Sequence, residues 1–140
     1  MIIDFQIEHF DQLDFEENTH AKRSRRNEYA QFAQRGPAVT LWIDGPVACG
    51  GVVVHWPGVG ELWMLRGVRA QEHPVSLVKA ARKAMEDAIQ KYNLHRIQAA
   101  VEALDVKGLR FIDALGMVCE GRLVAYGPGK EDHLMFARVN

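Results

Sequence analysis

The sequence contains only two cysteines, Cys49 and Cys119, and they lie far apart in apolar, strand-like segments. Two are too few for a disulfide framework, and neither belongs to a CxxC motif. We therefore expect both to be reduced core residues of an intracellular protein. The first residues lack the basic start of a signal peptide, and no apolar run approaches the roughly 18 residues of a membrane-spanning helix. These absences predict a soluble, cytoplasmic protein.

An excess of charge of one sign is also missing, because the net charge is −1. A nucleic-acid-binding protein would therefore need a local basic patch, for which Lys22, Arg23, Arg25 and Arg26 are candidates. A solvated helix face whose arginines pair with neighbouring acids explains this cluster better, so we expect no nucleic acid as a partner. The six histidines lack the spacing of metal ligands, which argues against a metal site. Nucleophile-elbow, Walker and dinucleotide motifs are absent too.

What is present is an ordinary globular composition. The 140 residues are 48% hydrophobic and 25% charged, which fits one core. We find no internal repeat, low-complexity segment or domain boundary, and predict a single domain over residues 1–140.

The hydrophobic pattern predicts an α/β fold, with a mixed sheet of six or seven strands and three or four helices. Strand, helix and strand follow one another over residues 61–101, which favours a parallel pair joined by a crossover helix. Gly50-Gly51 indicates a bulge or a close approach by another group. The expected strands are 2–7, 38–43, 47–55, 61–65, 95–101, 117–126 and 133–139; the expected helices lie within 8–34, over 74–92 and after Asp105 to Leu115.

The junction between the strand over 61–65 and the helix over 74–92 predicts an anion-binding site. Pro74 suits the first helical position, where its missing N–H loses nothing. The free amides after it would face a basic turn, an arrangement that favours a phosphate. A solvated turn is the alternative. The residues that would contact the anion are Arg66, Arg69, Val75, Ser76 and Leu77.

This order of elements resembles the GCN5-related N-acetyltransferase fold over roughly residues 38–139. The hairpin within residues 39–54, the strand Glu61-Leu62-Trp63-Met64-Leu65 and the helix over 74–92 correspond to the family's hairpin, fourth strand and cofactor helix. Residues 105–117 look like the family's N-x-x-A-x-x-x-Y-x-x-L-G-F segment. The chain also resembles a small group of phage-encoded acetyltransferase-like proteins, including small internal virion proteins of short-tailed phages. That likeness lies in Leu62-Trp63-Met64-Leu65, Lys91-Tyr92 and Arg110-Phe111.

The resemblance implies that acetyl-coenzyme A binds between diverging fourth and fifth strands. Its pantetheine amides would pair with the backbone of Trp63, Met64 and Leu65, and its pyrophosphate would rest on the turn into the helix. The chain departs from the family at three points. Residues 69–76 lack the glycines of the family's turn, Ile112 replaces the usual tyrosine, and Asp105 replaces the usual asparagine. Asp105 can cap its helix but adds negative charge beside the cofactor path.

Glu61 is the candidate general base, since it could take a proton from an attacking ammonium directly or through water. The alternative is an exposed residue at a strand end. Tyr126 could replace the missing acid, or its ring could simply pack while its hydroxyl faces water. His73 and His133 have suitable chemistry but are as easily explained as structural or exposed residues.

These observations together predict an acetyl-CoA-dependent N-acetyltransferase that acts on an unidentified small-molecule or protein amine. The alternative is a catalytically silent acetyltransferase scaffold serving as a phage virion or host-interaction module, which the missing glycines and Ile112 favour. We expect a cytoplasmic location, which would be the host cytoplasm or the virion for a phage protein. A homodimer could form through Trp42, Trp56 and the last strands.

Overall fold

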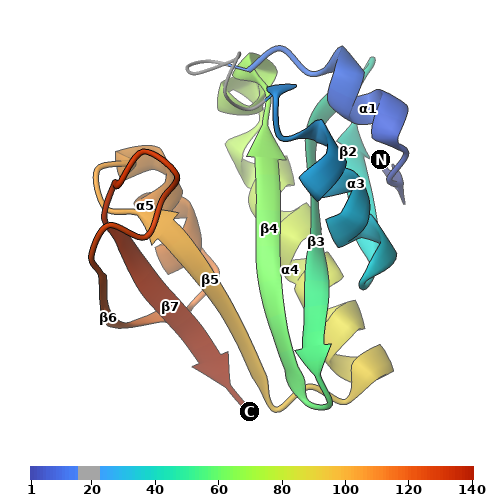
Figure 1. Cartoon of the computed structure of the whole chain (residues 1–140). Coiled ribbons are helices and arrows are strands. Elements are labelled where there is room, and N and C mark those ends of the chain that lie inside the picture. The colour runs from blue at the N-terminus through green and yellow to red at the C-terminus, as the bar shows by residue number, and fades with distance from the viewer. Residues whose placement is uncertain (16–22) are drawn as a thin grey trace.

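The computed structural model describes residues 1–15 and 23–140. Its seven strands form one mixed sheet in the order β1-β2-β3-β4-β5-β7-β6, and four α-helices of the described part flank it (Figure 1). This confirms the predicted α/β fold. The bounds are β1 Ile2–Asp4, α1 Ile7–Gln12, α3 Arg26–Gln34, β2 Ala38–Trp42, β3 Pro46–Trp56, β4 Val59–Arg66, the 3₁₀ helix η1 Val68–Glu72, α4 Pro74–Tyr92, β5 Arg96–Glu102, α5 Val106–Ala114, β6 Val118–Leu123 and β7 His133–Val139.

The helices lie in two layers, one on each face of the sheet. Alternate strand residues point to opposite faces, so each layer has its own core. On the face covered by α4 and α5, Met85 packs with Val52, Ile97 and Phe136. On the face covered by α1, Phe10 and Leu13 pack with Cys49 and Leu65. Among the described helices, none is long and apolar enough to span a membrane.

The predicted hairpin, crossover and helix ends are confirmed. β2 and β3 pair antiparallel, and β4 and β5 pair in parallel across α4. Pro74 opens α4, and Asn93 ends it with a left-handed φ of 51°. Asp105 caps α5 by accepting a hydrogen bond from the Gly108 amide at 3.0 Å, and Gly116 follows α5 with a φ of 77°.

Three local predictions were wrong. The first strand ends at Asp4, and Ile7 begins α1, which lets Phe10 reach the core. β6 ends at Leu123 instead of residue 126, before Ala125 adopts a φ of 53°. Cys119 is exposed instead of buried, because β6 is an edge strand whose side chains mostly face solvent.

The basic segment lies beside α1. Lys22 is outside the described residues. Arg23 donates to the Phe10 and Asp11 carbonyl oxygens, Arg25 pairs with Glu28, and Arg26 forms a bidentate pair with Asp11. These contacts hold the three arginines within the fold, as expected for a helix face paired with nearby acids.

Gly51, the second glycine of the Gly50-Gly51 pair, allows neighbouring groups to approach β3 closely. The strand register is unbroken at both glycines, so the pair forms no bulge. A Cβ added to Gly51 would lie 2.4 Å from the Pro37 carbonyl oxygen and 2.9 Å from Trp63 Nε1. Contacts this short would force the backbone of Pro37 or the indole to move. Gly51 therefore sets how tightly the segment before β2 and the Trp63 side chain pack against β3.

We expect Gly51→Ala to lower the free energy of unfolding by about 1–3 kcal/mol because of this overpacking. Gly121→Ala in β6 is the matched control, since its added Cβ would meet no atom within 4 Å. The control should change stability by less than about 0.5 kcal/mol. Urea denaturation followed by circular dichroism measures both, and equal stabilities of the two variants would contradict the packing argument.

Candidate functional site

The parallel pairing of β4 with β5 stops part-way along the two strands. Val59, Gly60 and Glu61 pair with Arg96, Ile97 and Gln98, respectively, and no later residue of β4 pairs with β5. Figure 1 shows the two strands close together at one end and far apart at the other. Beyond Glu61, the β5-facing edge of β4 therefore carries backbone N–H and C=O groups that no neighbouring strand uses.

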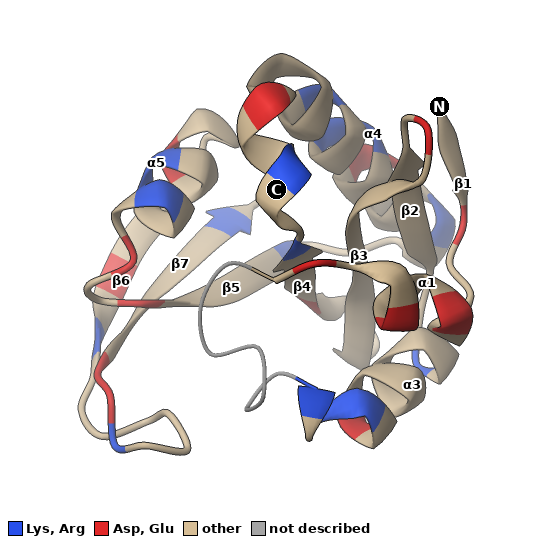
Figure 2. Cartoon of the chain, turned by 90° about the horizontal axis from the view of Figure 1, so that it is seen from above, with Lys and Arg blue, Asp and Glu red and all other residues tan. Residues whose placement is uncertain are grey.

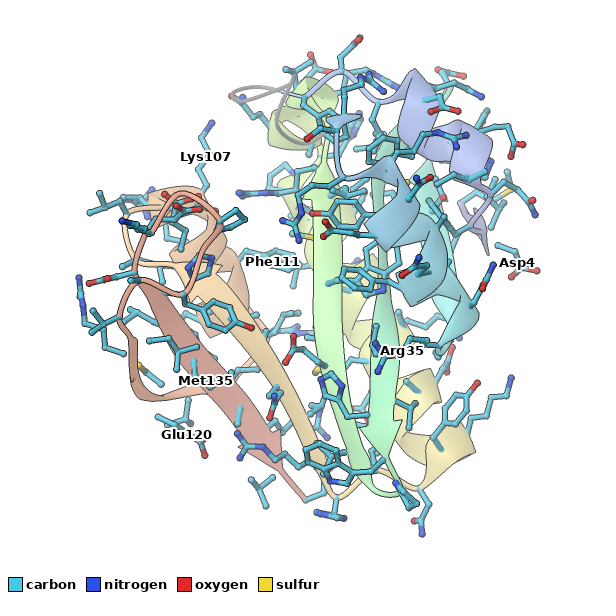
Figure 3. The ribbon with its side chains drawn as sticks, in the orientation of Figure 1. Asp4, Arg35, Lys107, Phe111, Glu120 and Met135 are labelled. Carbon is cyan, nitrogen blue, oxygen red and sulfur yellow. The ribbon has the colours of Figure 1, made fainter. Side chains whose placement is uncertain are left out.

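A cavity of about 220 Å³ opens between the diverging strands and continues beneath α4 and α5. Most of its lining is aliphatic or small, from β3, β4, β5 and the two helices. Phe111 projects from α5 toward β4 within this gap (Figure 3). The lining includes Leu41, Gly50, Val52, Leu62, Trp63, Met64, Arg66, Leu77, Ala80, Ala81, Ala84, Ala99, Val101, Glu102, Asp105, Gly108, Ile112 and Leu115.

An ion pair spans the mouth of this cavity. Arg66 Nη2, at the end of β4, donates to Asp105 Oδ2 at 2.9 Å, while Asp105 Oδ1 caps α5. Both side chains are half-exposed. Figure 2 looks down on this end of the molecule, and Lys and Arg residues are visible on α4 and α5. Anything long that enters the cavity here must pass or displace the Arg66–Asp105 pair.

The start of α4 offers open amides at the same end of the molecule. Among the described residues, Val75 and Ser76 have no partner for their backbone N–H groups, and both residues are exposed. The Leu77 amide donates to the His73 carbonyl oxygen at 3.0 Å, and its side chain is buried and lines the cavity. The predicted anion contacts are therefore open at Val75 and Ser76 and occupied at Leu77.

Arg69 points elsewhere. Its guanidinium donates to the carbonyl oxygens of Ile43 and Asp44 in the turn between β2 and β3. It does not line the cavity whose mouth holds Arg66. The structure thus separates two arginines that the sequence places three residues apart, because η1 turns the chain between them.

The opposite face of the sheet carries a carboxylate at the point where the strands separate. Glu61 Oε1 accepts a hydrogen bond from Gln98 Nε2 at 2.8 Å and lies 3.4 Å from His55 Nε2. The Glu61 side chain is 27% exposed, so water or a ligand can reach it. It lies within β4 instead of at its first residue, since β4 begins at Val59.

Tyr126 lies on the loop between β6 and β7 and stacks edge-on against His133, with ring centroids 5.1 Å apart. Burial of the hydroxyl, and then the charge of Glu61, raise the pKa of the Tyr126 phenol. The phenol therefore carries its proton at neutral pH, as an ordinary tyrosine does. His73 ends η1 and precedes α4, where it serves as a backbone junction.

The remaining predicted residues divide between the two faces. Met64 and Arg66 face the cavity side, whereas the Trp63 ring packs against Phe5, Tyr29 and Phe32 on the other. Leu65 is buried beside Cys49. The predicted contacts of Trp63, Met64 and Leu65 involve their backbone, which lies in the part of β4 that pairs with β3 and not with β5.

Sequence reasoning missed His55, Gln98 and Phe111 as parts of this region. Gln98 could have been found from the register of the predicted parallel strands, because the residue that pairs with Glu61 lies on the same face of the sheet. His55 shares a face with Glu61 through the β3–β4 hairpin, where Val53 pairs with Glu61. The described residues contain no group of three or more potential metal ligands.

No protein-family model matches this sequence, and no curated protein matches it. Solved structures do match over nearly the whole chain. A chimera of the spermidine N-acetyltransferase SpeG from Vibrio cholerae and hSSAT is 13% identical, with a TM-score of 0.77, and the match covers 99% of this chain and 95% of that one. The ribosomal-protein-alanine N-acetyltransferase of Brucella melitensis is 13% identical, with a TM-score of 0.75 and coverage of 100% and 99%.

The ribosomal-protein-S5-alanine acetyltransferase of Vibrio fischeri is 15% identical, with a TM-score of 0.71 and coverage of 99% and 92%. The chain has the acetyltransferase fold. This finding agrees with the resemblance over residues 38–139 and extends it to the N-terminal part of the chain. At these identities the likeness concerns the fold, and the neighbours' substrates remain properties of those proteins.

The two roles of Asp105 in this acetyltransferase fold can be separated by mutation. Asp105→Ala removes the cap of α5 and should lower the free energy of unfolding by about 1 kcal/mol. Asp105→Asn keeps a capping oxygen and loses only a half-exposed ion pair, which contributes about 0–1 kcal/mol. Urea denaturation should therefore give Asp105→Asn and Arg66→Gln similar free energies of unfolding, and both values should lie nearer to that of the wild type than the value for Asp105→Ala does. Equal losses for Asp105→Ala and Asp105→Asn would mean that the ion pair, not the cap, carries the stability.

Proposed function

We propose that this protein is an acetyl-CoA-dependent N-acetyltransferase that acetylates an amine. The observation that carries the proposal is the end of β4–β5 pairing at Glu61 and Gln98. At that point the sheet has an open backbone edge and a cavity on one face, and a half-buried carboxylate on the other. The acetyltransferase fold of the solved neighbours supports the same reading.

The residues of the opening suit a molecule with a polar arm and an anionic end. The unpaired edge over residues 62–66 could pair with the amides of a pantetheine arm, as Trp63, Met64 and Leu65 were predicted to do. The open amides of Val75 and Ser76 and the guanidinium of Arg66 could hold phosphate oxygens. Acetyl-CoA would supply an acetyl thioester, which an amine can attack.

In this proposal, Glu61 accepts the proton that an ammonium must lose before it attacks. Gln98 holds the carboxylate by a hydrogen bond, and His55 lies close enough to pass the proton on. The C–N bond then forms as the C–S bond breaks, and the sulfur takes up a proton. Tyr126 is the candidate donor, because its phenol carries a proton at neutral pH and the charge of Glu61 contributes to its raised pKa, which indicates that the two side chains lie near each other.

A second candidate is the catalytically silent scaffold. The Arg66–Asp105 pair across the mouth and the absence of glycine from residues 69–76 favour it, since both hinder access of phosphate to backbone amides. In this case the protein would bind another macromolecule without catalysing a reaction, as a phage virion or host-interaction module.

Binding of acetyl-CoA decides between the two. We expect isothermal titration to give saturable binding and thermal melts with millimolar acetyl-CoA to show a higher Tm, because a ligand of the native state stabilises it by mass action. Arg66→Ala should weaken that binding, whereas Arg122→Ala, which removes a surface arginine paired with Asp132, should leave it unchanged. No heat of binding and no change in Tm would support the silent scaffold.

The base role of Glu61 can be tested once an amine is found by screening primary amines for release of free thiol. Glu61→Gln keeps the hydrogen-bonding shape but accepts no proton, so kcat/KM should fall by about 10²–10⁴ while acetyl-CoA binding is retained. Glu86→Gln is the control, since Glu86 lies on α4 and pairs with Arg138, away from Glu61 and Gln98. If the Glu61→Gln rate catches up with the wild type at high pH, where the amine loses its proton unaided, the base role is supported. An unchanged rate at neutral pH would rule it out.

A further inference from the structure

The inner end of the cavity is lined by alanines where large core residues would be usual. Ala81 and Ala84 face it from α4, Ala99 from β5, and Val52, Leu62 and Leu115 complete the lining. α4 presents alanine at three successive sheet-facing positions, Ala80, Ala81 and Ala84, before Met85 restores a large side chain. Interiors normally fill such space with side-chain atoms.

Part of this lining can be reached by solvent, whereas Val52, Ala99 and Leu115 are buried. Leu62, Ala81 and Ala84 are only half-buried, although they lie between the sheet and the helices. By contrast, Met85, Ala88 and Ile97 at the next level of the same layer are fully buried. The hollow is therefore local, and it is continuous with the cavity that opens at Arg66 and Asp105.

The hollow adjoins the point where β4 and β5 separate. Leu62 follows Glu61 and Ala99 follows Gln98, and because successive strand residues face opposite sides, these two point to the α4 face. A thioester held beside Glu61 would thus have the alanine-lined hollow directly behind it. Its lining has no charged side chain, unlike the mouth with Arg66, Glu102 and Asp105.

We propose that this protein transfers acyl groups longer than acetyl, with the acyl chain held in the hollow beneath α4. The inference rests on the proposed function and extends its donor from acetyl-CoA to a straight-chain acyl-CoA of about four to eight carbons. The reaction is otherwise the same: the amine nitrogen bonds to the acyl carbon, the C–S bond breaks, Glu61 receives the amine proton and coenzyme A leaves as the thiol.

The chemistry of the hollow supports a hydrocarbon occupant. The hollow is part of a cavity that measures about 220 Å³ with its mouth included, and an apolar cavity of roughly 150 Å³ stays dry and admits benzene. A polar arm would lose its hydrogen bonds to water among these aliphatic side chains and find none in return. The polar arm therefore belongs along the open edge of β4, and the apolar chain beneath α4.

Titration calorimetry with coenzyme A, acetyl-CoA, butyryl-CoA and hexanoyl-CoA tests the inference. We expect hexanoyl-CoA to bind at least about tenfold more tightly than acetyl-CoA, because each fully buried methylene group tightens binding by about fourfold. Ala84→Leu fills the hollow. It should bring the Kd of hexanoyl-CoA to within about threefold of the Kd of acetyl-CoA, while the Kd of acetyl-CoA changes little.

Lys83→Leu is the matched control, because it adds the same apolar side chain outside the cavity. Lys83 is the exposed neighbour of Ala84 and pairs with Asp87. Ala81→Leu provides a second filling variant if Ala84→Leu folds poorly, which circular dichroism checks. Equal binding of acetyl- and hexanoyl-CoA by the wild type, or an undiminished preference in both filled variants, would overturn the inference and leave the proposed function standing. Absence of binding by all four compounds would contradict the proposed function and, with it, this inference.

Discussion

The end of hydrogen bonding between β4 and β5 is the constraint on which the rest of this structure depends. Backbone groups inside a sheet almost always find partners in the next strand, yet β4 has none on its β5 side beyond Glu61. The separation persists because each strand is held from its other edge. β4 pairs along its length with β3, and β5 pairs along its length with β7.

The two halves are joined at the mouth by side chains instead of backbone. Arg66 reaches from the end of β4 to Asp105, which also begins α5, and Phe111 fills part of the gap from the next turn of that helix. A half-exposed ion pair contributes at most about 1 kcal/mol to stability, so it can open at little cost to the fold. The opening is therefore maintained by the sheet and closed only by groups that are easily displaced.

The separation also brings two chemically different surfaces to one point. Because adjacent residues of a strand face opposite sides, Glu61 and Leu62 place a carboxylate on one face and an apolar wall on the other. A reactive group threaded between the strands could meet a polar partner on one side and an apolar pocket on the other. This division, more than any single residue, gives the opening one polar side and one apolar side.

Local signals explain which features could be predicted. The Asp44-Gly45 turn, Pro74 at the start of α4 and the Asp105 cap with its closing Gly116 act within a few residues, so the pattern of the chain reveals them. The predictions that went wrong depended on distant neighbours. Ile7 joins a helix whose Phe10 packs in the core, and Cys119 is exposed because β6 is an edge strand of the sheet in the described part of the chain.

The candidate site divides in the same way. The sequence by itself determined the α/β class, the strand–turn–helix junction and the open amides of Val75 and Ser76, since these follow from hydrophobic period and from the geometry of a helix end. Only the tertiary structure decided that Gln98 meets Glu61, that Arg69 turns to the β2–β3 turn while Arg66 meets Asp105, and that alanines on α4 leave a hollow. Those outcomes depend on strand register and on the packing of helices against the sheet, which join residues far apart in the chain and have no local signature.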